Sequence, residues 1–273
     1  MEGQTPIKID IEKIIRSKTK KKIPKFIFRL VEKIIHQQEI NTFFENNIGI
    51  EGLDFVNAAL NYLNVQIVIK GEENIPAEGE FIFASNHPLG GLDGLAMSSI
   101  IGKHFDGKIK FLVNNFLMHL TPLAPLFVPI NVGGRIQDRN LNSNIKNIFE
   151  SKQQFLIFPA GICSRKINGK IQDLTWKKTF ISKAKESGRS IIPVYFEAQN
   201  SRFFYNLARI RKALGIKLNI EMMFLPHEMF KQKGKTFTVT FGKPISHEVF
   251  DDTKTQLQWA QYVRECVYKM KNF

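Results

Sequence analysis

The fold of this chain follows from residues 81–94, which read FIFASNHPLGGLDG. The first four side chains are apolar, and Gly90, Gly91 and Gly94 mark a turn before a helical stretch. A short apolar run that enters a glycine-rich turn and then a helix is typical of a buried strand in an α/β sheet. Open α/β sheets bind ligands where polar side chains follow such strands. The segment therefore predicts both a fold class and the place of a site.

Short apolar strands alternate with amphipathic helices on both sides of this segment. The expected strands are 65–69, 81–84, 109–113, 126–130, 155–158, 191–196 and 236–241, and the expected helices are 52–63, 95–101, 141–151, 176–185 and 253–271. This alternation predicts an α/β fold with a mostly buried central sheet flanked by helices. We assign residues 65–273 to this domain and residues 1–64 to a separate, basic N-terminal helical region.

The N-terminal region contains a basic amphipathic segment. Ten Lys or Arg residues stand against three acidic residues between residues 8 and 33, and apolar side chains recur at helical spacing from Ile23 to Ile35. Pro24 marks a helix start. One interpretation is an ordinary helix with a solvated charged face. The other is docking on anionic lipid, to which each nearby cation contributes about 1 kcal/mol.

Composition limits the class of partner and the chemistry. The formal net charge of +14 predicts a negatively charged partner, either nucleic acid, an anionic leaflet or an acidic carrier protein. The chain lacks an RNP motif, finger spacing and a basic region followed by heptads, which argues against nucleic acid. Cys163 and Cys266 form no C-x-x-C pair, so neither a metal site nor a disulfide framework is indicated. We also expect no secretory leader and no membrane span.

His87 and Asp93 are the candidate catalytic pair. A lone histidine is more often structural, but Asp93 lies close enough across the turn to accept a hydrogen bond from one imidazole nitrogen. That contact would leave the other nitrogen free to take a proton from a substrate hydroxyl. Backbone N–H groups near Gly90, Gly91 and Gly94, at the helix start, are expected to face a developing oxyanion.

Asn86-His87 followed by Asp93 resembles the signature block of the glycerolipid acyltransferase (PlsC-like) superfamily, typified by 1-acyl-glycerol-3-phosphate acyltransferases. The resemblance implies that His87 deprotonates the acceptor hydroxyl and that Asp93 orients it. It also implies an acyl-CoA or acyl carrier protein thioester as donor, with no metal and no bound cofactor. Five residues separate His87 and Asp93 where the common pattern has four. The variant is similar to the hemolysin-like branch, which includes lyso-ornithine-lipid and lyso-glycine-lipid O-acyltransferases.

A second block supports the same branch, and the similarity runs over residues 34–241. Phe158-Pro159-Ala160-Gly161 is followed by Ser164-Arg165, by Asp173-Leu174-Thr175-Trp176, and by further short matches at 193–194, 200–201 and 204–205. The substrate-binding residues that the resemblance implies are Asn86, Gly90, Gly91, Arg135, Arg139, Phe158, Pro159, Gly161, Ser164 and Arg165.

Two departures from the family pattern bear on the acceptor. Phosphate-acceptor enzymes usually carry Phe-Pro-Glu-Gly, whereas Ala160 stands here in the acidic position. The usual acceptor-binding arginine is also shifted, so that Arg135 or Arg139 would have to substitute. These changes make a lyso-amino-acid lipid, which offers a carboxylate, at least as plausible an acceptor as lysophosphatidate. A guanidinium grips carboxylate or phosphate through two bonds, and Arg165 is the first candidate. The alternative is that these arginines are solvated or pair with Asp138 and Asp173.

The sequence thus predicts an O-acyltransferase that moves a fatty acyl group from a thioester to a lyso-lipid hydroxyl. Its expected partners are an anionic membrane surface, an acidic acyl carrier protein and the lyso-lipid acceptor, at the cytoplasmic face of the inner membrane as a peripheral protein. The alternatives are a 1-acyl-sn-glycerol-3-phosphate acyltransferase and a non-catalytic basic membrane adaptor. No Gly-x-Ser-x-Gly elbow or Walker A loop is present, and Cys163 reads as a packed cysteine.

Overall fold

The computed structural model describes residues 8–18, 23–113, 117–118, 120–129, 149, 151–217 and 219–272. The chain forms two compact units. Unit 1 consists of Met1–Ile50 and Asn200–Lys233, and unit 2 consists of Glu51–Gln199 and Gly234–Phe273. This division differs from the predicted boundary after residue 64. Helix α4 (Gly52–Tyr62) belongs with the sheet because it packs against α5 (Gly91–His104), and residues 200–233 belong with the N-terminal region.

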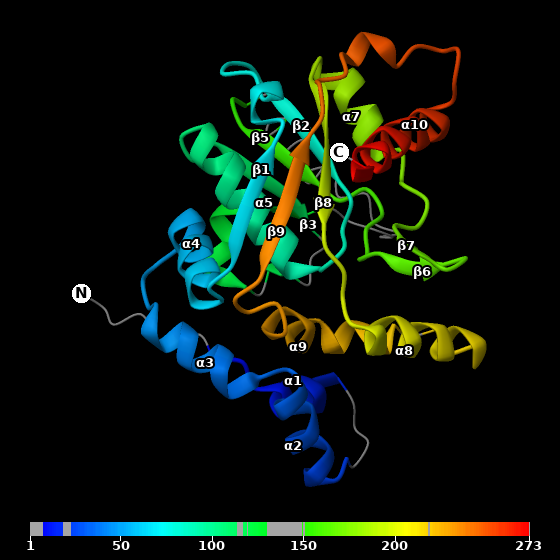
Figure 1. Ribbon diagram of the computed structural model, residues 1–273. Coiled ribbons are helices and arrows are strands. Elements are labelled where there is room, and N and C mark those ends of the chain that lie inside the picture. The colour runs from blue at the N-terminus through cyan, green and yellow to red at the C-terminus, as the bar shows by residue number, and fades with distance from the viewer. Residues whose placement is uncertain are drawn as a thin grey trace. The chain divides into compact units, whose positions relative to one another are not determined.

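Unit 2 is built on a seven-stranded sheet (Figure 1). Its strand order is β1 (Gln66–Lys70), β9 (Thr236–Phe241), β8 (Ser190–Glu197), β2 (Phe81–Ser85), β5 (Gln154–Ile157), β3 (Ile109–Val113) and β4 (Phe127–Pro129). All neighbouring strands pair in parallel except β8 and β9, which are antiparallel. The predicted α/β fold with a central sheet flanked by helices is confirmed.

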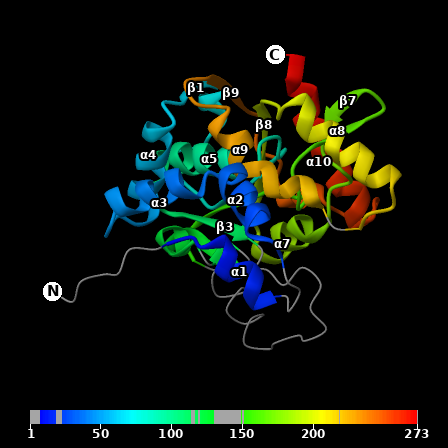
Figure 2. The same ribbon diagram turned by 90° about the horizontal axis from the view of Figure 1, so that it is seen from below.

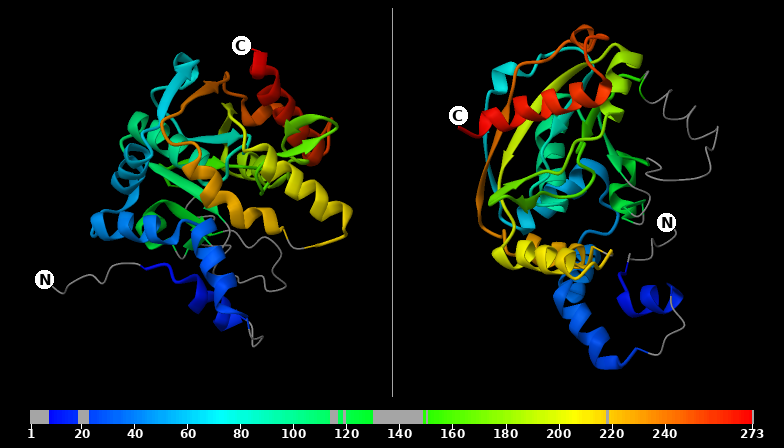
Figure 3. Two further views of the ribbon diagram at one scale, coloured as in Figure 1. Left: turned by 60° about the horizontal axis from the view of Figure 1, so that its bottom comes forward. Right: turned by 90° about the vertical axis from the view of Figure 1, so that its right-hand side faces the viewer.

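The central strand β2 is buried along its whole length because helices cover both of its faces. Ile82 and Ala84 belong to the core cluster under α7 (Thr179–Ser187) and α10 (Gln256–Lys269), which lie side by side (Figures 1 and 3). On the other face, the Phe83 ring meets Phe105, which directly follows α5, and Phe241. Strand β1 is different: it lies at the sheet edge, and its side chains alternate between exposed and half-buried.

Three helix predictions need correction or comment. Helix α5 begins at Gly91 rather than residue 95, and α7 begins at Thr179 rather than residue 176. The later start of α7 has a clear cause, because the Trp176 side chain is fully buried and its indole donates to Asp173 (2.9 Å). The predicted helix 141–151 lies almost wholly outside the described residues. The C-terminal helix α10 starts with a capping box formed by Thr255 and Gln258.

A short antiparallel hairpin of β6 (Arg165–Ile167) and β7 (Lys170–Gln172) follows the second sequence block and was not predicted. Its turn residues Asn168 and Gly169 have φ angles of 48° and 80°. Asn-Gly is the residue pair that favours a two-residue turn with positive φ at both positions. The hairpin carries the chain from the second block towards Asp173.

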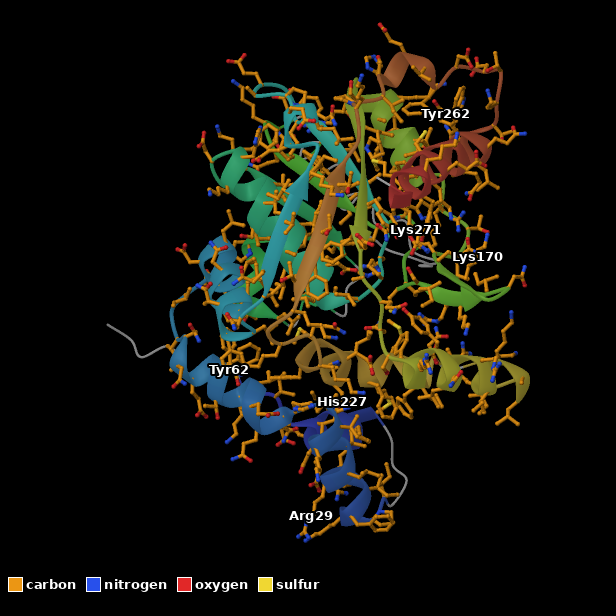
Figure 4. The ribbon with its side chains drawn as sticks, viewed as in Figure 1. Arg29, Tyr62, Lys170, His227, Tyr262 and Lys271 are labelled. Carbon is orange, nitrogen blue, oxygen red and sulfur yellow. The ribbon has the colours of Figure 1, made fainter. Side chains whose placement is uncertain are left out.

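Unit 1 is helical in its described part. It contains α1 (Ile11–Lys18), α2 (Lys25–Ile34), α3 (Gln37–Asn46), α8 (Arg202–Ala213), the short 3-10 helix Ile220–Phe224 and α9 (Leu225–Phe230) (Figure 2). Helix α2 starts directly after Pro24, as predicted. The two chain segments are joined through His36, whose Nε2 lies 2.9 Å from Nδ1 of His227 and whose ring stacks on Phe230. Figure 4 marks His227 in α9 and Arg29 in α2.

Candidate active site

The loop between β2 and α5 holds the candidate catalytic pair, and Asn86 anchors its start. The Asn86 Nδ2 donates to the Phe196 carbonyl (2.9 Å), and its Oδ1 accepts from the Phe196 N–H (2.7 Å). Phe196 belongs to β8, the strand beside β2. Both ends of the buried amide are therefore used by the backbone. The side chain predicted to bind substrate holds the end of β2 in place for His87.

His87 and Asp93 lie at hydrogen-bond distance, with His87 Nδ1 3.1 Å from each carboxylate oxygen of Asp93. The buried carboxylate is itself fixed, because Oδ2 accepts from the Leu89 N–H and Oδ1 from the Gly94 N–H, both at 2.9 Å. A carboxylate at Nδ1 places the proton on that nitrogen and leaves a lone pair on Nε2. No described residue hydrogen-bonds Nε2, and the side chain is 17% exposed. The imidazole is thus oriented to accept a proton.

The surroundings of His87 make the imidazole more basic. Burial lowers its pKa, but the charge of Asp93 and its hydrogen bond outweigh burial, and the charge of Asp173 acts in the same direction. Arg165 opposes them weakly. The net result is a pKa above the ordinary value of 6.5. A base with a pKa raised in this way has a stronger pull on the proton of a hydroxyl at neutral pH.

The second sequence block packs directly on the first. The Phe158 ring stacks on the His87 imidazole with centroids 4.1 Å apart and planes 22° apart. The Ser164 N–H donates to the His87 carbonyl (2.7 Å). The turn after Phe158 closes with a hydrogen bond from the Gly161 N–H to the Phe158 carbonyl, and Gly161 has a φ of 74° that favours glycine. Pro159 accepts from the Lys177 N–H (3.0 Å). This block shapes one wall around the imidazole.

Asp173 links the two blocks, a role that sequence reasoning missed. Its Oδ1 accepts from Ser164 Oγ (2.6 Å) and from the His87 N–H (3.2 Å), and its Oδ2 accepts from Trp176 Nε1 (2.9 Å). Burial raises the pKa of Asp173, and these hydrogen bonds oppose the shift. The sequence interpretation considered this carboxyl as an arginine partner, but the groups that donate to it are a hydroxyl, an indole and a backbone amide. Its place in the Asp-Leu-Thr-Trp block was the available signal.

Arg165 lies inside the protein. Its Nη1 donates to the carbonyls of Cys163 (2.6 Å) and Ser164 (3.2 Å), so the guanidinium supports the loop that carries them. Burial raises the pKa of the Cys163 thiol to about 11, which keeps it protonated and agrees with a packed cysteine. Arg135 and Arg139 lie outside the described residues.

Gly90 and Gly91 stand where α5 begins. Gly90 is buried and has φ 89° and ψ −108°, a conformation that only glycine adopts readily. Within the described residues, the backbone N–H groups of Gly90 and Gly91 have no hydrogen-bond partner. Free amides at a helix start attract negative charge, so their position suits an oxyanion beside His87.

The described residues contain no group of three or more His, Cys, Asp or Glu side chains that could hold a metal ion. None of the helices within them is both long and apolar enough to cross a bilayer.

Comparison with known proteins decides the family. The model of a family described as "Acyltransferase" matches residues 11–273. The chain belongs to this acyltransferase family. It is 51% identical over 265 residues to a lyso-glycine lipid O-acyltransferase of Bacteroides thetaiotaomicron, with 96% of this chain and 97% of that protein covered. A protein of the same name from Phocaeicola vulgatus is 49% identical, with 96% and 95% covered.

Among solved structures, the 1-acyl-sn-glycerophosphate acyltransferase PlsC of Thermotoga maritima aligns with a TM-score of 0.49 and 17% identity. The alignment covers 96% of this chain and 88% of that one. The expected membership of an acyltransferase family is confirmed by the family match and the two relatives. This acyltransferase is therefore an enzyme that moves acyl groups, and the alternative of a non-catalytic membrane adaptor is wrong.

Proposed function

We propose that this acyltransferase transfers a fatty acyl group from a thioester to the hydroxyl of a lyso-amino-acid lipid, with lyso-glycine lipid as its acceptor. The observation that carries the proposal is the buried Asp93 carboxylate at 3.1 Å from His87 Nδ1, in a chain about half identical to two lyso-glycine lipid O-acyltransferases. A buried carboxylate that orients an imidazole is the arrangement needed to activate a hydroxyl.

The chemistry follows from this geometry. His87 Nε2 takes the proton as the acceptor oxygen forms a bond to the thioester carbonyl carbon, and the carbonyl electrons move to oxygen. Asp93 stabilises the imidazolium that results. The amides of Gly90 and Gly91 would hold the oxyanion. When the intermediate collapses, the C–S bond breaks and the thiolate takes the proton back from His87.

The acyl donor in this proposal is an acyl carrier protein thioester or acyl-CoA. The net charge of +14 suits the acidic surface of a carrier protein, which would speed encounter. Both donors carry the same thioester, so the transfer step is the same with either.

The test is a direct assay of the purified protein with both donors and three acceptors, namely lyso-glycine lipid, lyso-ornithine lipid and lysophosphatidate. We expect diacylated product from lyso-glycine lipid at a kcat/KM at least about tenfold above lysophosphatidate, because a dedicated headgroup site rejects the wrong headgroup by unpaired polar groups. Mass spectrometry of the products gives the answer. Product from lysophosphatidate alone would overturn the acceptor while the transfer mechanism stood.

We further propose that unit 1 docks on the anionic cytoplasmic face of the inner membrane. Helix α2 exposes Phe26, Leu30 and Ile27, with exposed fractions of 68%, 56% and 37%, beside Lys25 and Arg29. Arg29 projects from α2 in Figure 4. Large exposed apolar side chains among cations are typical of an interfacial helix.

Helix α8, in the second segment of unit 1, also exposes large apolar side chains among cations. Phe203 and Ile210 are about half exposed, at 48% and 53%, and Leu214, just after the helix, is 69% exposed. Four of the twelve residues of this helix are Lys or Arg, and none is acidic. The sequence interpretation considered only the N-terminal segment, because α8 was not predicted.

A vesicle experiment tests the docking. Replacing both Phe26 and Leu30 by Asp should lower partitioning onto phosphatidylglycerol vesicles by at least about tenfold, because each apolar side chain that leaves lipid costs about 1.5–3 kcal/mol. The matched control is Val249→Asp, which changes an exposed apolar residue of unit 2. Co-sedimentation measures binding. Equal loss in both proteins would remove α2 as the docking element.

A further inference from the structure

A hollow of about 610 Å³ lies in unit 2, and Asp173, which accepts a hydrogen bond from the His87 N–H, is part of its lining. It is formed where the end of the hairpin and the segment that follows it face α10, and Figure 4 marks these elements by Lys170 and Tyr262. The lining residues that matter here are Ala160, Ile167, Asp173, Leu174, Lys177 and Arg264. No role in the mechanism above uses the hollow, although Asp173 is part of its wall.

The charges that line the hollow are unbalanced. Its cations are Lys177 and Arg264, and its acidic residue is Asp173. The Asp173 carboxylate is already occupied by Ser164, Trp176 and the backbone of His87. Residue 160, on the same wall, is an alanine and supplies no charge. The lining therefore carries a net charge of one positive unit, which favours binding of one anion.

Lys177 offers an ammonium group that makes no hydrogen bond or ion pair with a described residue. The group lies above Gly161, where an added Cβ would approach Lys177 Nζ to 3.0 Å. The backbone of Lys177 is fixed by its hydrogen bond to Pro159, next to the Phe158 ring that stacks on His87. The exposed Lys177 side chain therefore starts from a fixed backbone position and places its ammonium near the Gly161 turn.

Arg264 supplies a pre-positioned guanidinium with remaining donor capacity. Its Nη2 donates to Gln172 Oε1 (3.0 Å) and to the Asp173 carbonyl (2.8 Å), and its guanidinium carbon lies 4.8 Å from the Tyr268 ring centroid. The Arg264 Nε is buried and has no hydrogen-bond partner among the described residues. Because Nε has no access to the hollow, the donor left for an anion is Nη1, which makes no hydrogen bond with a described residue.

We propose that Lys177 and Arg264 bind the carboxylate of the acceptor's amino-acid headgroup in this hollow. The choice of lipid rests on the proposed function. Ile167, Leu174 and Ala160 give the hollow an apolar side, which suits the short carbon stem next to a carboxylate. A donor phosphate fits less well, since the pantetheine arm separates it from the thioester. The hollow is instead close to the catalytic histidine, because Asp173 in its wall accepts a hydrogen bond from the His87 N–H (3.2 Å).

The test pairs a protein change with a substrate change. Lyso-glycine lipid is compared with its carboxamide, using the wild type, Lys177→Met, Lys177→Arg and the matched control Lys178→Met, which changes the adjacent exposed lysine outside the lining. We expect Lys177→Met to lower kcat/KM for the carboxylate about tenfold through the acceptor KM, and to leave the carboxamide unchanged. Lys177→Arg should retain most of the activity, and Lys178→Met should match the wild type.

A binding measurement separates this proposal from the proposed function. Calorimetric titration with a short N-acylglycine that lacks the reacting hydroxyl should show binding to the wild type and about tenfold weaker binding to Lys177→Met. Binding with this difference, in a protein that fails to acylate lyso-glycine lipid, would support the hollow and overturn the function. Turnover with equal effects of Lys177→Met on carboxylate and carboxamide would overturn the hollow alone. A rise in the donor KM instead of the acceptor KM would also overturn it.

Discussion

His87→Ala should lower kcat by about 10²- to 10⁴-fold, the usual contribution of a general base. Asp93 contacts Nδ1 and leaves Nε2 free to take the proton. No other described imidazole contacts Asp93, so none can replace His87 as the base. The His87 N–H bond to Asp173 and the Ser164 N–H bond to the His87 carbonyl do not involve the ring, so its removal should leave the fold intact. Single-turnover acyl transfer measures the loss, and circular dichroism with thermal unfolding checks the fold.

The matched control for this variant is His104→Ala, which removes an imidazole from the C-terminal end of α5 in the same unit. Its kcat should equal that of the wild type. Retained transfer by His87→Ala, in protein whose melting curve is unchanged, would remove the imidazole from the mechanism. The family membership of the chain would be unaffected.

Asp93→Asn should have the next largest effect, a fall in kcat of about 10²-fold or more together with a shifted pH profile. The free-enzyme profile of kcat/KM should fall as pH decreases through the His87 pKa, because only the neutral imidazole accepts a proton. Since Asp93 is the main cause that raises this pKa above 6.5, the acid limb of the wild type should lie above pH 6.5. Loss of the charge should move the limb to lower pH.

The pH series needs a control carboxylate, and Asp106→Asn provides it because that side chain is 90% exposed and pairs with the exposed Lys108 at 4.0 Å. Its profile should overlay that of the wild type. A limb in Asp93→Asn that stays at the wild-type pH would show that Asp93 does not set the basicity of His87. A limb that moves to higher pH would have the same meaning.

Much of the fold was predictable because its signals are local. Strands 109–113 and 236–241 were predicted to the residue, since short stretches rich in aromatic and β-branched residues need no knowledge of distant contacts. The Asn168-Gly169 turn was an equally local signal that was overlooked. Helix α8 was missed although Ser201, which accepts a hydrogen bond from the Phe204 N–H, is a local N-cap signal.

What the sequence by itself determined is the loop that carries His87 and Asp93. The strand, the glycines and the two side chains lie within fourteen consecutive residues, so short-range geometry brings them together. Only the tertiary structure decided what surrounds them. Asp173 bonds to the backbone of His87 across 86 residues, and Arg264 bonds to Asp173 across 91. Such contacts depend on how β5, the hairpin and α10 pack, which no local pattern encodes. The hollow exists only through that packing.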